Sequence, residues 1–240
     1  MNHLLNEEQF PAGFLPAWFE ARRRHALEQA EQLPEPSRHM ESWRFGAPGN
    51  ESLEHVEAAP PAALETLAPI IRERASMTEA FRIVYANGLP VSIPEELPEG
   101  LSVMDMEDFV LQCPDTARKY LETETETLGS EKLSALATAF QHNGLVIMAD
   151  REISLPLEIL HFISGDNVAV FPSTLLIAET GSRLRILERH ISADHGRQFC
   201  GALQQYHLSS ASSVKYALVQ ELKRRSRAVE LSHIMPDESY

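Results

Sequence analysis

The chain has 240 residues, and 35 acidic against 21 basic side chains give it a formal net charge of −14. A chain of this length buries roughly 70% of the surface that its unfolded form exposes, so it can form a core without disulfide or metal staples. The acidic balance argues against nucleic acid as a partner, because phosphate recognition needs clustered basic residues and the one cluster, Lys223 to Arg227, is short.

No apolar run approaches the roughly 18 residues needed to cross a bilayer, and the first ten residues carry no basic leader region. We therefore expect a cytoplasmic protein with no membrane partner. Cys113 and Cys200 lie far apart and form no C-x-x-C motif, so a disulfide framework or a four-thiolate metal site is not available within one chain. Two reduced thiols are expected.

The first 143 residues predict a helical N-terminal domain with one short hairpin. Between Pro16 and Pro34, apolar side chains recur among charged ones, which predicts a helix bounded by the two prolines. Pro- and Glu-rich connections follow. Within them, Trp43 beside Arg44 is interpreted as an aromatic anchor onto the body of the protein, in preference to a binding site.

Three further elements are predicted before residue 144. Asn87 and Gly88 separate two apolar runs, which is a strong hairpin signal. A helix is expected near Asp105 to Cys113, and the alternating Glu and Thr of residues 116–129 favour an exposed loop. The clearest helix runs through residues 130–144, with Ser130 at its N-cap and a glycine just past its end.

From residue 144 to 240 the sequence changes to short strand-like runs separated by turns, without a long helix. In one of these runs Leu184 and Ile186 alternate with Arg183 and Arg185, so one face of the strand is buried. The pattern fits either a β-sandwich or an irregular β-helix whose coils stack, and it does not choose between them. The fold class is α+β and mainly β.

Four segments together resemble the SufB/SufD family of subunits of the SUF iron-sulfur cluster assembly scaffold, and its SufD branch in particular. They are the run ESWRF, the tripeptide ANG, the helical segment EKLSALATAFQHNGLVI and the turn and strand AETGSRLRILERHIS, which begin at Glu41, Ala86, Glu131 and Ala178. Each is weak alone, but they occur in the family's order. SufB shares the β-helix and remains an alternative assignment.

The resemblance implies a helical domain, residues 1–143, followed by an irregular right-handed parallel β-helix, residues 144–240. It implies that neighbouring coils cover the face of Leu184 and Ile186. It also implies that the chain stops before the family's last coils and C-terminal helical domain, so we carry over no functional residue of the family. The implied function is that of a noncatalytic scaffold subunit that pairs with a SufB-like subunit and a SufC-like ATPase.

The lone chain is expected to hold no stable cofactor, because an iron-sulfur cluster would need thiolates from elsewhere in a complex. The alternative function is a β-helix enzyme acting on carbohydrate or a metal-dependent substrate. Such an enzyme would need carboxylates or histidines gathered in an open groove. Glu179 and Glu188 are the candidates for a carboxylate pair, but we interpret both as solvated turn charges.

The histidines are candidates for metal ligands. His190 and His195, with Asp194 between them, have a spacing that could seat a metal ion. A metal site needs a third and a fourth ligand that this spacing does not supply, so we interpret the segment as a polar turn between coils. His161 and His207 lie in strand-like runs and are expected to be hydrogen-bonded edge or core residues. We therefore assign no catalytic or metal-binding residue, and cofactor-binding residues remain unknown.

Cys200 could accept sulfur or bind a cluster in a scaffold protein, but no basic residue adjoins it in the sequence to lower its pKa, so a small buried apolar role is preferred. The last strand-like runs present an apolar row of Val229, Leu231 and Ile234. If no further strand covers them, we expect self-association through this end of the stack.

Overall fold

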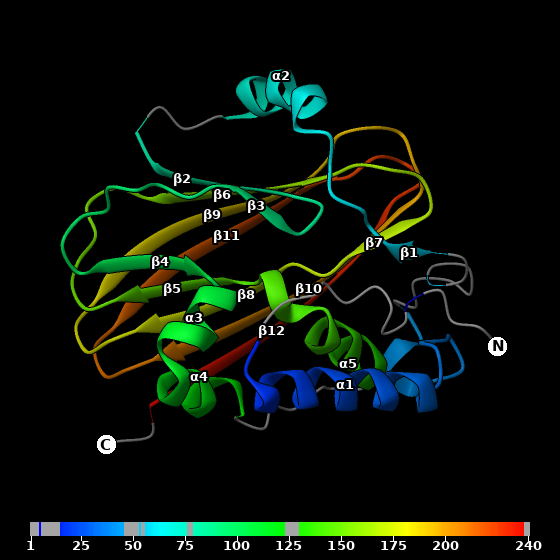
Figure 1. The fold of residues 1–240 in the computed structure, drawn as a ribbon, viewed down its shortest axis with the longest axis horizontal. Coiled ribbons are helices and arrows are strands. Elements are labelled where there is room, and N and C mark those ends of the chain that lie inside the picture. The colour runs from blue at the N-terminus through cyan, green and yellow to red at the C-terminus, as the bar shows by residue number, and fades with distance from the viewer. Residues whose placement is uncertain are drawn as a thin grey trace.

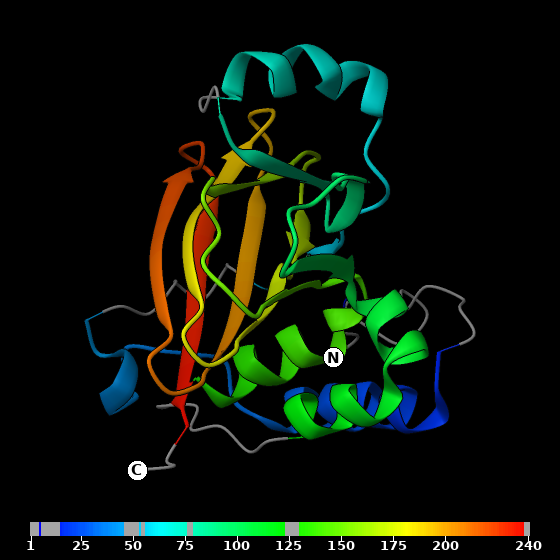
Figure 2. The same ribbon diagram turned by 90° about the vertical axis from the view of Figure 1, so that its left-hand side faces the viewer.

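The computed structural model describes residues 5, 15–45, 53, 56–75, 79–122 and 130–237. A parallel β-solenoid of about three turns forms the body, and helices cover both of its outer faces (Figure 1). Turned by 90°, the same molecule shows α2 on one side of the strands and the other helices on the opposite side (Figure 2). The expected combination of helices with a parallel β-helix is confirmed.

Two sheets face each other across the interior of the solenoid. The first, sheet A, is bounded on one side by α1, α3, α4 and α5, and the second, sheet B, is bounded by α2. Sheet A contains, in order, β1 (Glu57–Ala58), β7 (Val168–Val170), β10 (Gln198–Leu208), β8 (Ser173–Ala178), β5 (Leu145–Ala149) and β4 (Leu101–Asp105), with β12 (Arg227–Pro236) paired to β10. Sheet B contains β11 (Ser213–Glu221), β9 (Arg183–Ser192), β6 (Leu157–Ile163), β2 (Phe81–Ala86) and β3 (Leu89–Ser92).

Successive coils pair in parallel register from β6 through β9 to β11, and from β5 through β8 to β10 and β12. The predicted hairpin forms as β2 and β3, and Asn87 and Gly88 take positive φ angles of 50° and 78° at its turn. Because β2 also pairs in parallel with β6, the hairpin belongs to sheet B. The division of the chain at residue 143 stays a prediction.

Apolar side chains from both sheets fill most of the solenoid interior. Leu184 and Ile186 of β9 point inward and are 2% and 4% exposed, while Arg183 and Arg185 point outward into solvent. The face of Leu184 and Ile186 is covered by a cluster that contains sheet A residues, such as Ile147, and residues of the neighbouring coils, such as Leu157. Neighbouring coils contribute the lateral contacts.

Helices α1 (Ala17–Gln32) and α5 (Glu131–Ala139) pack together on sheet A. Arg23 lies at their interface, is 0% exposed, and donates from Nε to the carbonyl oxygen of Ala139 at 2.9 Å, which satisfies a carbonyl at the end of α5. Its Nη1 pairs with Glu20 Oε1 at 3.0 Å, so the buried charge has a partner. Trp43 is buried in the same cluster and Arg44 is exposed, in agreement with the predicted anchor.

Helix α2 (Leu64–Arg74) lies on the outer face of sheet B. Leu67 packs against residues of β2, β6 and β9, and Arg74 Nη1 donates to Glu221 Oε2 of β11 at 3.0 Å. Arg189 also pairs with Glu221 and lies 3.7 Å from Glu158, a fully buried carboxylate that Arg82 contacts at 2.7 Å. These ion pairs compensate the charges that the helix buries.

Two details differ from the sequence predictions. Residues 114–121 form α4 (Pro114–Leu121), where an exposed loop was expected, because Ala117 and Leu121 are buried against α3 (Met106–Gln112); the remainder of that predicted loop, residues 123–129, lies outside the described residues. Val229 and Leu231 pack against the helical cluster, so Ile234, 64% exposed, is the member of the predicted apolar row that faces solvent.

None of the helices in the described part of the chain is long and apolar enough to cross a bilayer.

The last coil generates a prediction of self-association. Among the described strands, β11 pairs with β9 and β12 pairs with β10, so each leaves one edge without a neighbour. We expect a second copy of the chain to pair there, and the double variant Val219→Lys/Ile234→Lys to shift the mass in light scattering from dimer to monomer, because a joined stack would bury unpaired lysines. Leu111→Lys, at a comparably exposed position on α3, is the control and leaves the mass unchanged. A monomeric parent protein at tens of micromolar would contradict the prediction.

Candidate functional site

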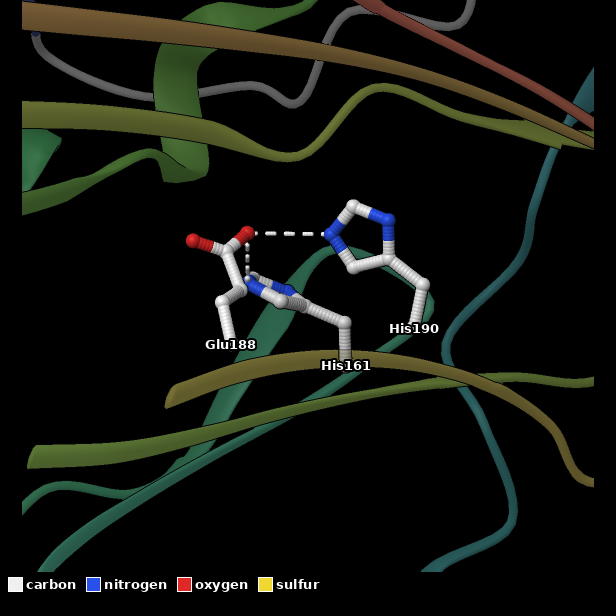
Figure 3. A group of neighbouring side chains, drawn as sticks. All are labelled: His161, Glu188 and His190. Carbon is white, nitrogen blue, oxygen red and sulfur yellow. Dashed lines mark hydrogen bonds and ion pairs between the residues drawn. The ribbon is translucent and has the colours of Figure 1, made fainter. Parts of the chain in front are cut away.

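A polar cluster lies inside the otherwise apolar interior of the solenoid. It consists of His161 from β6 and of Glu188 and His190 from β9, whose side chains turn toward one another (Figure 3). Glu188 and His190 share the inward face of β9 with Leu184 and Ile186 because residues two apart point the same way. All three side chains are at most 4% exposed.

The register of the coils brings the two histidines together. His161 pairs directly with His190 across the two strands, and their ring centroids are 5.2 Å apart in an edge-to-face arrangement. His190 also pairs with Gln220 of β11, and His161 with Tyr85 of β2, whose ring centroid is 5.3 Å away. A column of ring and amide side chains therefore runs through successive coils of sheet B.

Glu188 is the shared partner of both histidines. Its Oε1 lies 2.9 Å from His190 Nε2, a hydrogen bond, and 3.3 Å from His161 Nε2. Its other oxygen, Oε2, accepts a hydrogen bond of 3.0 Å from the Tyr216 hydroxyl of β11. From the opposite sheet, Gln204 Nε2 donates to Oε1 at 3.4 Å. The carboxylate is thus contacted by side chains of four strands, β6, β9, β10 and β11.

The electrostatics of the cluster favour one ion pair. Burial raises the pKa of Glu188, but the contacts with His161 and His190 outweigh it and hold that pKa below its usual range. Burial lowers the pKa of His190, but its contacts with Cys200 and Glu188 raise it well above the ordinary value. Burial lowers the pKa of His161 and is the dominant cause there. These directions favour an ion pair between Glu188 and His190 beside an uncharged His161.

The structure separates the residues that the sequence grouped. Asp194 and His195 do lie in the turn after β9, where Asp194 accepts hydrogen bonds from the backbone of Gly165 and Gly196, and His195 is exposed. The interpretation of His190 as part of that turn is wrong, because it lies within β9 and is buried. A group of three potential ligands does form around His190, but its other members are Glu188 of the same strand and His161 of the neighbouring coil.

The two carboxylates proposed as a pair also separate. Glu179 is an exposed turn residue, as expected. Glu188 is fully buried, so its interpretation as a solvated turn charge is wrong. Residue parity carried the missed signal, because Glu188 and His190 have the same parity as Leu184 and Ile186, which were already expected to be buried.

The remaining sequence candidates have structural roles. Cys200 is fully buried, as expected, yet its sulfur lies 3.6 Å from His190 Nδ1, so a basic group does adjoin it in space. His161 is a core residue, as expected, but neither of its ring nitrogens has a hydrogen-bond partner among the described residues. His207 packs its ring 4.6 Å from that of Tyr120, and burial, with Lys119 nearby, lowers its pKa to about 4. Cys113 is a free thiol at the junction of α3 and α4, in a different cluster from Cys200.

A helix-covered parallel β-solenoid with a buried polar cluster is the class of structure that these observations define. The chain is similar to the iron-sulfur cluster assembly protein SufD of Bacillus subtilis (strain 168), with 25% identity over 187 residues. The similarity covers 74% of this chain and 42% of the relative, so the chain spans less than half the length of that protein. No family model matches the chain. The resemblance to SufD seen in the sequence motifs is thereby confirmed.

The burial of Glu188 generates a stability prediction. Glu188→Ala removes the partner of a buried imidazolium and leaves the Tyr216 hydroxyl without its acceptor, so we expect a loss of about 3–5 kcal/mol in the free energy of unfolding. The control Glu179→Ala changes an exposed carboxylate and is expected to change that free energy by less than about 0.5 kcal/mol. Urea denaturation with a chelator present measures both, and equal effects would contradict the assigned role of Glu188.

Proposed function

We propose that this protein is a noncatalytic scaffold subunit in iron-sulfur cluster assembly, acting in a complex with a SufB-like subunit and a SufC-like ATPase. The observation that carries the proposal is the similarity to SufD over 187 residues, supported by a fold that agrees with the resemblance. The relative's name gives its role in cluster assembly. The partners and the noncatalytic role are inferred from the family resemblance.

The alternative of a β-helix enzyme receives less support. It requires acidic or imidazole side chains that converge on an open groove. Glu179 and Glu188 do not meet, and Glu188 is enclosed in the core. The cleft between the β2–β3 turn and sheet A, bounded by Pro60, Asn87 and Phe171 among others, has no carboxylate or histidine among its described lining residues.

The arrangement of the two thiols fits a subunit that does not hold a cluster alone. Cys200 is inside the solenoid and Cys113 lies among the helices on sheet A. Cluster ligation by this chain would need further thiolates, which a partner in the complex would supply. A cytoplasmic location, where thiols stay reduced, is part of the same proposal.

Co-purification tests the proposal. We expect the chain, coexpressed with the SufB-like and SufC-like proteins of its own organism, to elute with both in size-exclusion chromatography. We further expect the complex to transfer a cluster to an apo-ferredoxin, followed by the visible absorption of the acceptor. Omission of this chain is the control for transfer. Failure to form a complex, or transfer that is equally fast without this chain, would contradict the proposal.

The lone chain gives a second test. Incubated anaerobically with iron and sulfide and then desalted, it is expected to keep no visible charge-transfer absorption, because two separated cysteines cannot ligate a cluster. It is also expected to hydrolyse no ATP, because the sequence contains no GxxxxGK[ST] motif. A stable cluster on a protein of monomeric mass, or turnover that persists through repurification, would contradict the scaffold role.

A further inference from the structure

The polar atoms inside the solenoid are incompletely satisfied. Among the described residues, no hydrogen-bond partner reaches His161 Nδ1 or Nε2, Thr174 Oγ1 or Gln204 Oε1, although all three side chains are buried. His161 Nε2 lies near Glu188 Oε1 but without the direction of a hydrogen bond. Each such atom costs about 1–3 kcal/mol unless water or an ion binds it.

We propose that the interior of the solenoid binds one first-row divalent transition-metal ion through the imidazoles of His161 and His190 and the carboxylate of Glu188. The proposal concerns residues of this chain alone and does not rest on the proposed function. It gives the three side chains a metal-binding role in place of a purely structural one.

The geometry of the three residues fits such an ion. Their ligand atoms all lie within 4.8 Å of one another, and two of the three separations are 2.9 Å and 3.3 Å. Around a tetrahedral Zn²⁺ with bonds of about 2.0–2.1 Å, neighbouring ligand atoms are about 3.3–3.4 Å apart. A small rotation of the Glu188 carboxylate would therefore suffice to place an ion between the three side chains.

The residues around the ligands resemble the outer contacts of metal sites. His190 Nδ1 lies 3.6 Å from Cys200 Sγ on the side of the ring away from Glu188, so Nδ1 can keep its proton while Nε2 binds the ion. Tyr216 and Gln204 donate to the two oxygens of Glu188 and so fix the carboxylate. Such contacts orient ligands before the ion arrives.

The charge and donor types select the kind of ion. Two imidazole nitrogens and one carboxylate suit Zn²⁺, Fe²⁺ or Co²⁺, whereas Mg²⁺ and Ca²⁺ prefer oxygen ligands. Three protein ligands leave a fourth position for water.

The last coil provides a route to the cluster. Tyr216 of β11 and Glu230 of β12 are both only partly buried, and Tyr216 contacts Glu188 directly. In the described part of the chain, β11 separates β9, which carries Glu188 and His190, from the outer edge of sheet B, and β6, which carries His161, lies behind β9. The Tyr216 hydroxyl is therefore the group that an ion would displace on its way to Glu188.

Zinc titration of the whole chain tests the proposal. Protein stripped with a chelator and dialysed is titrated with ZnCl₂ in a calorimeter, and the metal retained after desalting is measured by mass spectrometry. We expect one Zn²⁺ per chain and a rise in the melting temperature. Co²⁺ in place of Zn²⁺ is expected to give the visible absorption of a four- or five-coordinate ion.

The chain has ten histidines, including the two in the cluster, so variants are needed to distinguish the cluster from the others. His161→Gln and Glu188→Gln are expected to lower Zn²⁺ affinity by about 100-fold or more, since loss of an outer contact alone costs about 10–100-fold. Tyr216→Phe, an outer contact, is expected to fall within that smaller range. The controls His195→Gln and His207→Gln, which remove histidines outside the cluster, keep the parent affinity.

If all five variants retain as much zinc as the parent protein, the ion binds to groups outside the cluster, and the proposal is overturned. A parent protein that keeps no zinc after desalting would overturn it too, and would leave ordered water as the occupant of the polar interior. Circular dichroism checks that each variant folds. If Glu188→Gln does not fold, His161→Leu, which replaces a neutral imidazole with an apolar side chain of similar size, decides the question by the loss of the zinc-induced shift in melting temperature.

Discussion

Parallel register between successive coils decides which side chains meet inside this protein. Each inward residue of one coil lies beside its register partner in the next coil, so that Glu188, for example, lies between Ile159 and Leu218. One consequence is that His161 lies against His190, where two positive charges could not coexist. Glu188 resolves the conflict by stabilising one imidazolium, while burial keeps the other ring neutral. The arrangement of the cluster follows from the pairing of the strands.

The helices on the outside explain why the strand pattern was ambiguous. Strands of sheets covered on both faces have buried residues on both sides, and β6 and β8 are buried at every position. Such runs lack the alternation that would mark an inner and an outer face. The individual helices and the Asn87-Gly88 hairpin were predictable from local signals, because caps, prolines and turn residues act over a few positions. The stacking of coils was predictable through the family resemblance, because the long-range pairing has no local signal.

The cluster shows the same division between local and long-range information. The parity of β9 was sufficient to place Glu188 and His190 beside Leu184 and Ile186 in the interior. The arrival of His161 from the preceding coil depends on a register that no single strand encodes. The same holds for Cys200, which lies ten positions from His190 in sequence but meets it only because β10 crosses to the opposite sheet. Reasoning from neighbouring residues alone therefore gave a turn where the structure has a buried charged group.

Helix α2 has a consequence for how the protein unfolds. In a simple solenoid each coil contacts only its neighbours, so stability is a sum of local contributions and end coils can melt separately. Here α2 packs on β2, β6 and β9 through Leu67 and reaches β11 through the Arg74–Glu221 ion pair. Detachment of the last coil would break contacts to a helix that precedes it by 147 positions. The helix thus joins the coils into one cooperative unit, and the closure of so long a loop makes folding slower than that of a chain with mostly local contacts.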